Sequence, residues 1–462
     1  MAVVAAQTYR VAFRAPAPVE GRFYIAQHFR DQLVVRDSTL ATGRDIVFEG
    51  SLDRLPRAVY VLCDASRKPL LDFVMDGSRR LTIAYDASRS NAGMQVKGSP
   101  ANQSMYRYMA RLDAARAAAA EWRDASDAEA QRREDSLTAQ MRAAERRFFR
   151  DEGQYLFTRL VRMFAEVEPP AVVPDSVPPD GVSAWRARFV RDHYWDSVDL
   201  HDRSLIYTPH LFNKMNYFFF GLLYHADADE IRRCAFATLD RVADDSTMLR
   251  YFLDFLVPRY ERSSRIGWDQ VYVDLVKRYY LGGRCSWCSE AELYSRRRSV
   301  AFLSRSLIGA RGVELLMPDT NQSADPADWI SSHRFPEPYV ILWFWDPDCT
   351  HCQRQTAELA SLYDSLATAG EKLFEVYAVG YESDVEKWKR YVRDHRLPFV
   401  NVGGLNVNVD YQAVYNVHGA PTMIILDEER RIIMNKTIRT DDILPFLRQD
   451  MEKKRTQHRD NK

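Results

Sequence analysis

The chain lacks the features that would place it in a simple class. No apolar run approaches the ~18 residues that a membrane span needs. The 64 basic and 64 acidic side chains cancel, and no basic block dominates, so the charge pattern does not indicate a nucleic-acid partner. Six cysteines are too few for a disulfide scaffold in 462 residues, a length that favours several domains.

The two ends of the chain carry little information. Residues 1–7, MAVVAAQ, are small and apolar but lack the charged start and the full apolar core of a signal peptide. They fit either the remnant of a clipped secretory signal or a flexible terminus. Residues 452–462 are polar and mildly basic, which predicts a frayed end.

Residues 8–98 are predicted to form an antiparallel β-sandwich-like domain. Short apolar segments with period-two alternation are separated by turn signals, among them Thr-Gly at 42–43 and Asp-Gly at 76–77. Cys63 falls on the apolar parity of its segment and is expected to be a small buried hydrophobe. Strands are expected at 22–29, 33–35, 45–51, 57–64, 70–76 and 80–86.

Residues 99–307 are predicted to form a helical domain. From 103 to 166 there is no proline, and apolar residues recur at steps of three and four, as on one face of a helix. The proline-rich stretch 167–181 forbids helix and predicts a linker, after which helical patterns return at 229–244 and 247–262. Cys234 is expected to pack inside the second helical part. The histidines of this region show no metal-ligand spacing, and no metal is expected: His193, His201, His210 and His225.

Residues 308–452 alternate strand and helix patterns, which predicts an α/β domain. The run 339–346 is almost entirely apolar, as a central strand buried on both faces requires. Further strands are expected at 373–380, 399–403, 422–427 and 430–437, and helices at 350–369, 383–395, 408–416 and 440–453.

Four of the six cysteines form two C-x-x-C pairs. Cys349 follows the central strand and precedes a predicted helix, and a helix N-terminus stabilises a thiolate. Cys352 lies one helical turn later, within reach of a mixed disulfide on Cys349. A C-x-x-C pair beside a β-α-β pattern is typical of thioredoxin-like redox centres.

The second pair, Cys285 and Cys288, stands before a capping-box pattern formed by Ser289 and Glu292. Three interpretations stay open for it: a zinc half-site, a second redox pair that exchanges electrons with Cys349, and a structural disulfide. Zinc needs four ligands, and no further C-x-x-C or H-x-x-H pair remains to supply them.

The stretch 345-WDPDCTHC-352, followed by 419-GAPT-422 ahead of an apolar strand, resembles the thioredoxin superfamily, and more closely the TlpA/ResA-type thiol–disulfide oxidoreductases. The resemblance implies a thioredoxin fold over 308–452, with Cys349 as nucleophile, Cys352 as resolving thiol and Pro421 as the cis-proline. It places Trp345, Pro347, Thr350, His351 and Ala420 in supporting positions.

The upstream part is similar to Gram-negative envelope proteins in which a β-domain and a helical domain of unknown function precede the redox domain. The stretches 98-GSPANQ-103 and 277-KRYYLGGRCSW-287 carry this likeness. It implies a periplasmic or envelope location, a protein disulfide as substrate and a redox protein as electron donor or acceptor, with no cofactor. The alternative from another class is a non-catalytic scaffold that holds an envelope partner through residues 8–307.

The sequence departs from the family at two positions. Trp343 stands where typical thioredoxins keep a buried carboxylate, and Gln355 stands where the ResA-type branch has a Glu. The proton acceptor for Cys352 is therefore unassigned, with Glu358 as a candidate. His351, next to the resolving cysteine, predicts a pair more oxidising than thioredoxin, whose potential is about −270 mV against about −120 mV for DsbA.

Overall fold

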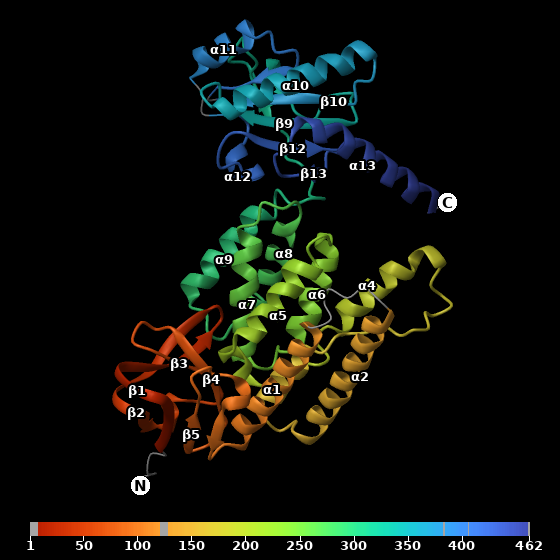
Figure 1. The fold of residues 1–462 in the computed structure, drawn as a ribbon. Helices are drawn as coiled ribbons and strands as arrows, with labels where there is room; N and C mark the ends of the chain where they lie inside the picture. Colours follow the sequence, from red (N-terminus) through yellow and green to blue (C-terminus); the bar gives the residue numbers. More distant parts are fainter. Residues whose placement is uncertain (1–7, 121–127, 382–383, 405, 461–462) are drawn as a thin grey trace. The chain divides into compact units, whose positions relative to one another are not determined.

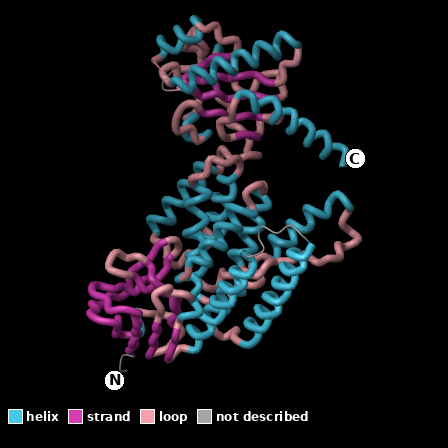
Figure 2. Tube along the Cα trace, viewed as in Figure 1, coloured by secondary structure: helices cyan, strands magenta, loops and turns pink. Residues whose placement is uncertain are grey.

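In the computed structural model, the described residues are 8–120, 128–381, 384–404 and 406–460. The expectation for residues 1–7 lies outside them. The chain divides into two compact units. The first contains the residues up to 226 together with 233–251, and the second contains residues 227–232 together with the residues from 252 onward. Among these residues no helix is both long and apolar enough to cross a bilayer. Strand content is confined to the two ends of the chain, with helices from 100 to 303 (Figure 2).

The first unit begins with a β-rich region, as predicted, in which β1 and β2 form a long hairpin (Figure 1). The strands are β1 (Thr8–Phe29), β2 (Gln32–Ser51), β3 (Ala58–Cys63), β4 (Pro69–Met75), β5 (Arg80–Ala84) and β6 (Gln95–Lys97). The first half of β1 pairs with β5 and its second half with β3. The rings of Phe13 in β1 and Phe73 in β4 pack against each other, with 5.2 Å between their centroids.

Two features of this region differ from the sequence expectations. The β1–β5 pairing is parallel, so the sheet is mixed rather than purely antiparallel. The Thr-Gly at 42–43 is not a turn, because Gly43 lies inside β2 and pairs with Val19. Pro16 and Pro18 lack the N–H that a strand ladder needs, and the β1–β2 register shifts between Arg14 and Val19. The hairpin is therefore irregular at this point but continuous across it.

The stretch 98-GSPANQ-103 joins the sheet to the first helix through a buried side chain. The Asn102 amide accepts a hydrogen bond from the Val74 N–H at 2.8 Å and donates to the Val74 carbonyl at 2.7 Å. It also donates to the Ser99 hydroxyl at 2.8 Å. Gly98 has a φ of 84°, and a Cβ there would lie 2.1 Å from the Arg80 carbonyl oxygen, which requires glycine.

The central region is helical, as predicted. Its helices are α1 (Pro100–Ala120), α2 (Ala128–Asp151), α3 (Leu156–Met163), α4 (Val182–His193), α5 (Pro209–Tyr217), α6 (Ala228–Asp240), α7 (Ser246–Glu261), α8 (Trp268–Leu275) and α9 (Glu290–Leu303). Residues 167–181 form a loop that ends in a short 3-10 turn. Two π-helical turns follow α5 and α8, at Phe218–Leu222 and Val276–Tyr280. Cys63 and Cys234 are both buried, as expected.

The C-terminal region has a sheet of order β11-β10-β9-β12-β13 with helices around it (Figure 1). The strands are β9 (Tyr339–Trp345), β10 (Phe374–Gly380), β11 (Val400–Val402), β12 (Thr422–Leu426) and β13 (Ile432–Met434), after the short β7 (Leu316–Met317) and β8 (Ile330–Ser331). The helices are α10 (Thr350–Ala369), α11 (Val385–Asp394), α12 (Tyr411–Tyr415) and α13 (Thr440–Asp460). The frayed end expected from residue 452 is instead helical to Asp460, because Glu, Lys, Arg and Gln favour helix.

The central strand β9 is buried along its whole length, because both faces of the sheet are covered. Its odd-numbered residues pack with side chains of α10, α11 and α13, including Leu359, Trp388 and Ile443. Its even-numbered residues pack with Tyr415 of α12 and Met317 of β7. The apolar run of the sequence is thus explained by period-two side chains that enter two separate cores. The strand ends at Trp345, and the candidate site follows directly.

Candidate functional site

Cys349 is the N-cap residue of α10, directly after the loop that leaves β9. Its N–H donates to the Asp346 carbonyl at 3.1 Å, which holds the loop in a tight turn. Its sulfur accepts the N–H of Cys352 at 3.3 Å. The thiol is partly exposed and free. The sulfur therefore lies at the positive end of the α10 dipole, where it is accessible from solvent.

Cys352 is a free thiol on the first turn of α10 and is fully buried. Burial raises the pKa of Cys352 to about 12, and the hydrogen bond with Cys349 and the charge of Asp346 act in the same direction. A hydrogen bond from the Asp346 backbone opposes them. The two cysteines therefore differ in the way that a nucleophile and a resolving thiol must, one accessible and one protected.

The segment from Ala420 to Thr422 lies beside Cys349. The Cys349 thiol donates to the Ala420 carbonyl at 3.9 Å, and the peptide bond between Ala420 and Pro421 is cis. Thr422 begins β12, where it pairs with Phe344 of β9. Antiparallel pairing of β12 with β9 thus brings a segment distant in sequence against the cysteine pair. Both Ala420 and Pro421 are partly exposed.

The other residues proposed to support the site occupy varied positions. Trp345 is fully buried, and its ring packs edge-on against the ring of Tyr391 in α11, with 5.2 Å between the ring centroids. Pro347 is also buried, and its carbonyl accepts from the Gln353 amide at 2.7 Å, which ties the loop to α10. Thr350 is exposed, as is His351, whose Nδ1 lies 3.2 Å from a guanidinium nitrogen of Arg354.

The positions where relatives keep carboxylates serve packing in this chain. The buried Trp343 indole donates to the Thr356 hydroxyl at 2.9 Å, so strand and helix are joined without a charge. The Gln355 amide donates to the Ile438 carbonyl at 2.7 Å. Glu358, the candidate acceptor from the sequence, is exposed and accepts from Thr440 at 3.3 Å.

Asp346 is the carboxylate that the sequence reasoning missed. It is partly exposed in the loop after β9, and its side chain accepts the Asp348 N–H at 2.8 Å. Burial is the main cause of the raised pKa of Cys352, and the charge of Asp346 makes a smaller contribution in the same direction. The residue is visible in the sequence as the first polar position after the central strand, but the comparison with relatives draws attention to other positions.

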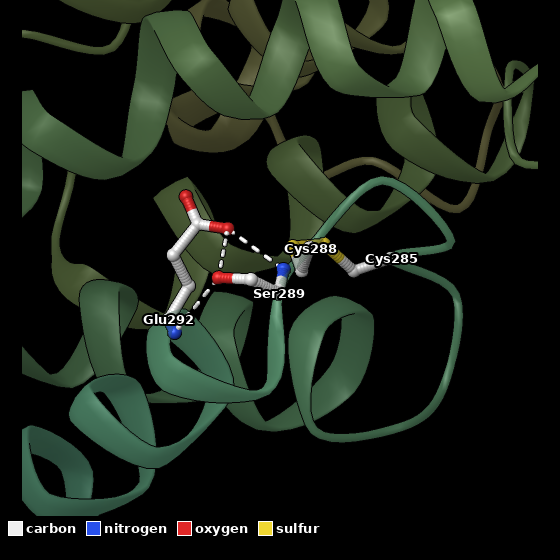
Figure 3. The surroundings of a disulfide bond; sticks show 4 residues. All are labelled: Cys285, Cys288, Ser289 and Glu292. Atoms are coloured by element: carbon white, nitrogen blue, oxygen red, sulfur yellow. Dashed lines mark hydrogen bonds between the residues drawn. A yellow bond between two sulfur atoms is a disulfide. The ribbon is translucent and has the colours of Figure 1, made fainter.

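The second cysteine pair forms a disulfide between Cys285 and Cys288, immediately before α9 (Figure 3). The Ser289 hydroxyl accepts the Glu292 N–H at 3.2 Å, and the Glu292 carboxylate accepts the Ser289 N–H at 2.8 Å, which completes the expected capping box. The bridge closes a turn that fixes the start of this helix. In the described part of the chain no group of three or more His, Cys, Asp or Glu side chains could hold a metal ion.

The strand order, the helix after β9 and the cysteine pair at that helix define a thioredoxin-like domain. The thioredoxin-like family model matches residues 337–432, so the C-terminal part of the chain is a member of that class. Residues 131–305 match a domain of unknown function, DUF5106. The predicted order of a β-rich region, a helical domain of unknown function and a thioredoxin-like domain is thereby confirmed. No curated protein matches the chain.

Several solved structures are similar to parts of the chain. A thioredoxin-like protein from Bacteroides caccae is 18% identical, with 61% of this chain and 97% of that chain covered and a TM-score of 0.47. A domain of a possible thiol-disulfide isomerase from Cytophaga hutchinsonii is 28% identical, with coverage of 32% and 97% and a TM-score of 0.28. The thioredoxin domain of a thiol-disulfide oxidoreductase from Bacteroides vulgatus is 23% identical, with coverage of 31% and 96% and a TM-score of 0.26.

Proposed function

We propose that the chain is a thiol–disulfide oxidoreductase acting on protein disulfides or thiols through Cys349 and Cys352. The observation that carries this proposal is the geometry of Cys349, which is accessible, caps α10 and lies against the Ala420 carbonyl. A thioredoxin-like domain supports a redox role for the chain. Residues Ala420 and Pro421 are proposed to lie along the bound substrate, whose backbone pairs with them like an added strand.

The reaction proceeds in two exchanges. The Cys349 thiolate attacks one sulfur of a substrate disulfide, forms a mixed disulfide and releases the other sulfur as a thiolate that takes up a proton. Cys352 then loses its proton and attacks the Cys349 sulfur, which releases the second substrate thiol. The substrate gains two electrons and the chain is left with a Cys349–Cys352 disulfide. A partner redox protein returns the electrons, or the same steps run in reverse to oxidise a dithiol.

The second exchange requires a proton acceptor because Cys352 is buried with a raised pKa. Asp346 is proposed for this role, since its carboxylate acts on the thiol and reaches solvent. Such an acceptor operates directly or through one water. Trp343, at a position where other family members have a carboxylate, is buried and donates to the Thr356 hydroxyl, so it cannot accept the proton.

Reduction of insulin disulfides with dithiothreitol tests the proposal. The wild type is expected to accelerate insulin precipitation, and Cys349→Ser is expected to abolish the effect because the nucleophile is lost. Cys234→Ser, which changes a buried thiol away from the site, is the matched control and should retain activity. Equal rates for wild type and Cys349→Ser would overturn catalysis and favour the scaffold function of residues 8–307.

The proposal extends to location and potential. The cell envelope is proposed because the order of regions resembles that of envelope redox proteins, and cell fractionation tests it. The pair is proposed to be more oxidising than thioredoxin because His351 adjoins the resolving cysteine. A redox titration is expected to give a value above about −270 mV, and a value at or below it would contradict this part of the proposal.

A further inference from the structure

A pocket in the helical part of the first unit is not used by the thiol chemistry. Its volume is 480 Å³, within the range of small-molecule sites. The pocket lies at the end of α3, along α4 and beside α5. Its walls are mainly apolar and aromatic and include Phe164, Val167, Val190, Tyr194 and Tyr217, with Lys214 as the lining cation.

Lys214 is an unusual wall residue because its side chain is buried, with the residue only 5% exposed. Its ammonium lies 4.0 Å from the ring centroid of Tyr194 and 6.0 Å from that of Trp195. Among the described residues no carboxylate pairs with the Lys214 ammonium and no hydrogen bond to its Nζ is formed. The Tyr194 hydroxyl donates instead to the Lys214 backbone carbonyl, at 3.1 Å. A cation–π contact compensates only part of the cost of burying a charge. Burial lowers the pKa of Lys214 to about 8, so the side chain is still largely protonated near neutral pH.

The backbone next to Lys214 supports the same interpretation. Helix α5 passes into a π-helical turn at Phe218–Leu222, and Leu222 also lines the pocket. In this turn Phe218 and Phe219 are buried. π-helical turns are rare and occur frequently at functional sites.

Two exposed aromatic rings add binding surface at the pocket. Phe164 is 51% exposed and Tyr217 is 57% exposed, although both are large and apolar enough to be buried in most proteins. The other charged group of the lining, Glu166, is exposed and makes no ion pair with Lys214. One buried cation beside an exposed carboxylate favours a ligand with a single negative charge over a dianion such as a phosphate monoester.

We propose that this pocket binds an amphipathic monocarboxylate, whose carboxylate pairs with Lys214 and whose apolar body lies between Phe164 and Tyr217. The bound anion supplies the partner that Lys214 lacks within the described chain. The apolar body covers the exposed rings, and their burial contributes to binding. The site is separate from the cysteine pair, so the proposal does not depend on the thiol chemistry.

Isothermal titration of the full chain with octanoate tests the proposal, with octanol as the uncharged ligand of matched length. Octanoate is expected to bind at one site about tenfold or more tighter than octanol, because a charge-assisted hydrogen bond contributes that much. Lys214→Met keeps the apolar stem and removes the charge, so it should remove this difference. Lys68→Met, at an exposed lysine of the same unit, is the matched control and should bind as the wild type does.

The pH dependence of the wild type gives a second readout that does not require a variant to fold. Lys214 loses its charge as the pH rises through about 8, so octanoate binding should weaken above that pH while octanol binding stays constant. Octanoate binding that is absent, no tighter than octanol binding, unaffected by Lys214→Met in a folded variant, or constant across this pH range would overturn the proposal.

Discussion

The proton acceptor of the resolving cysteine gives the sharpest test of the proposed mechanism. Burial raises the pKa of Cys352 from the ordinary 9.0 to about 12. At about 1.36 kcal/mol per unit, forming this thiolate costs about 4 kcal/mol more than forming an ordinary one, and at pH 7 only ~10⁻⁵ of the thiol is ionised. An acceptor that takes the proton during attack is worth about 10²–10⁴ in rate.

We therefore expect Asp346→Asn to slow the second exchange by about 10²-fold or more. The assay follows the reaction of the reduced protein with an aromatic disulfide that releases a coloured thiol. Attack by Cys349 releases one equivalent, and attack by Cys352 on the mixed disulfide releases the second. Asp346→Asn should slow only the second phase, and Cys352→Ser should eliminate it. Asp348→Asn, two residues further along the same loop, is the matched control, since Asp348 is exposed and pairs with Lys387.

The opposite sign would refute the reasoning. The charge of Asp346 raises the pKa of Cys352, so its removal alone lowers that pKa and increases the thiolate fraction. If Asp346 affects the reaction only through this field, Asp346→Asn will accelerate the second phase. An unchanged or faster second phase would therefore show that another group or water accepts the proton.

Three further predictions concern stability. Thr356→Val should destabilise the C-terminal domain by about 1–3 kcal/mol in urea unfolding, because the buried Trp343 N–H loses its acceptor. Thr356→Ser keeps a hydroxyl and should retain most of the wild-type stability. Equal unfolding midpoints for Thr356→Val and the wild type would contradict this prediction. Burial lowers the pKa of His210 from 6.5 to about 4. Its contribution to the free energy of unfolding is therefore complete above pH 6.5, and about 3 kcal/mol is lost as the pH falls towards 4. His210→Asn should flatten this part of the profile of stability against pH, and parallel profiles for variant and wild type would refute the prediction. Replacing both Cys285 and Cys288 with Ser opens a four-residue loop and should lower the free energy of unfolding by about 2 kcal/mol. The measurement is amide hydrogen exchange at the start of α9, which should become faster. Unchanged exchange would exclude a stabilising role for the disulfide.

The parts of the fold predicted best are those set by local pattern. The helix expected at 350–369 has those bounds in the structure, because Cys349 caps its start and Gly370 adopts the left-handed conformation at its end. The central strand β9 is predicted equally well, because a strand covered on both faces of the sheet requires an uninterrupted apolar run such as Tyr339–Trp345. In the N-terminal region the sequence predicts separate strands at 33–35 and 45–51, whereas the structure has one strand, β2, that continues through the Thr-Gly at 42–43.

The parts of the site that sequence reasoning missed depend on tertiary contacts. Four acidic residues lie close to the cysteine pair in sequence or on α10, and only the position of the loop after β9 singles out Asp346 by its contribution at Cys352: Asp346, Asp348, Glu358 and Asp364. In the sequence, Lys214 is not distinguishable from other lysines near the end of a helix. Its burial depends on the ring of Tyr194, which follows α4 and lies over its ammonium. Proximity between segments distant in sequence leaves no periodic signal in either segment.

The Asn102 contacts have a consequence for how the chain can be divided. One amide satisfies both backbone groups of Val74 and also binds Ser99, so the sheet and α1 share hydrogen bonds that neither can replace alone. A fragment that ends before residue 99 would leave the Val74 N–H and carbonyl without the Asn102 amide, and a fragment that begins there would leave that amide with Ser99 in place of both Val74 groups. Attempts to isolate the helical domain should therefore carry the β-rich region with it, because this junction is an internal part of one body rather than a tether between two.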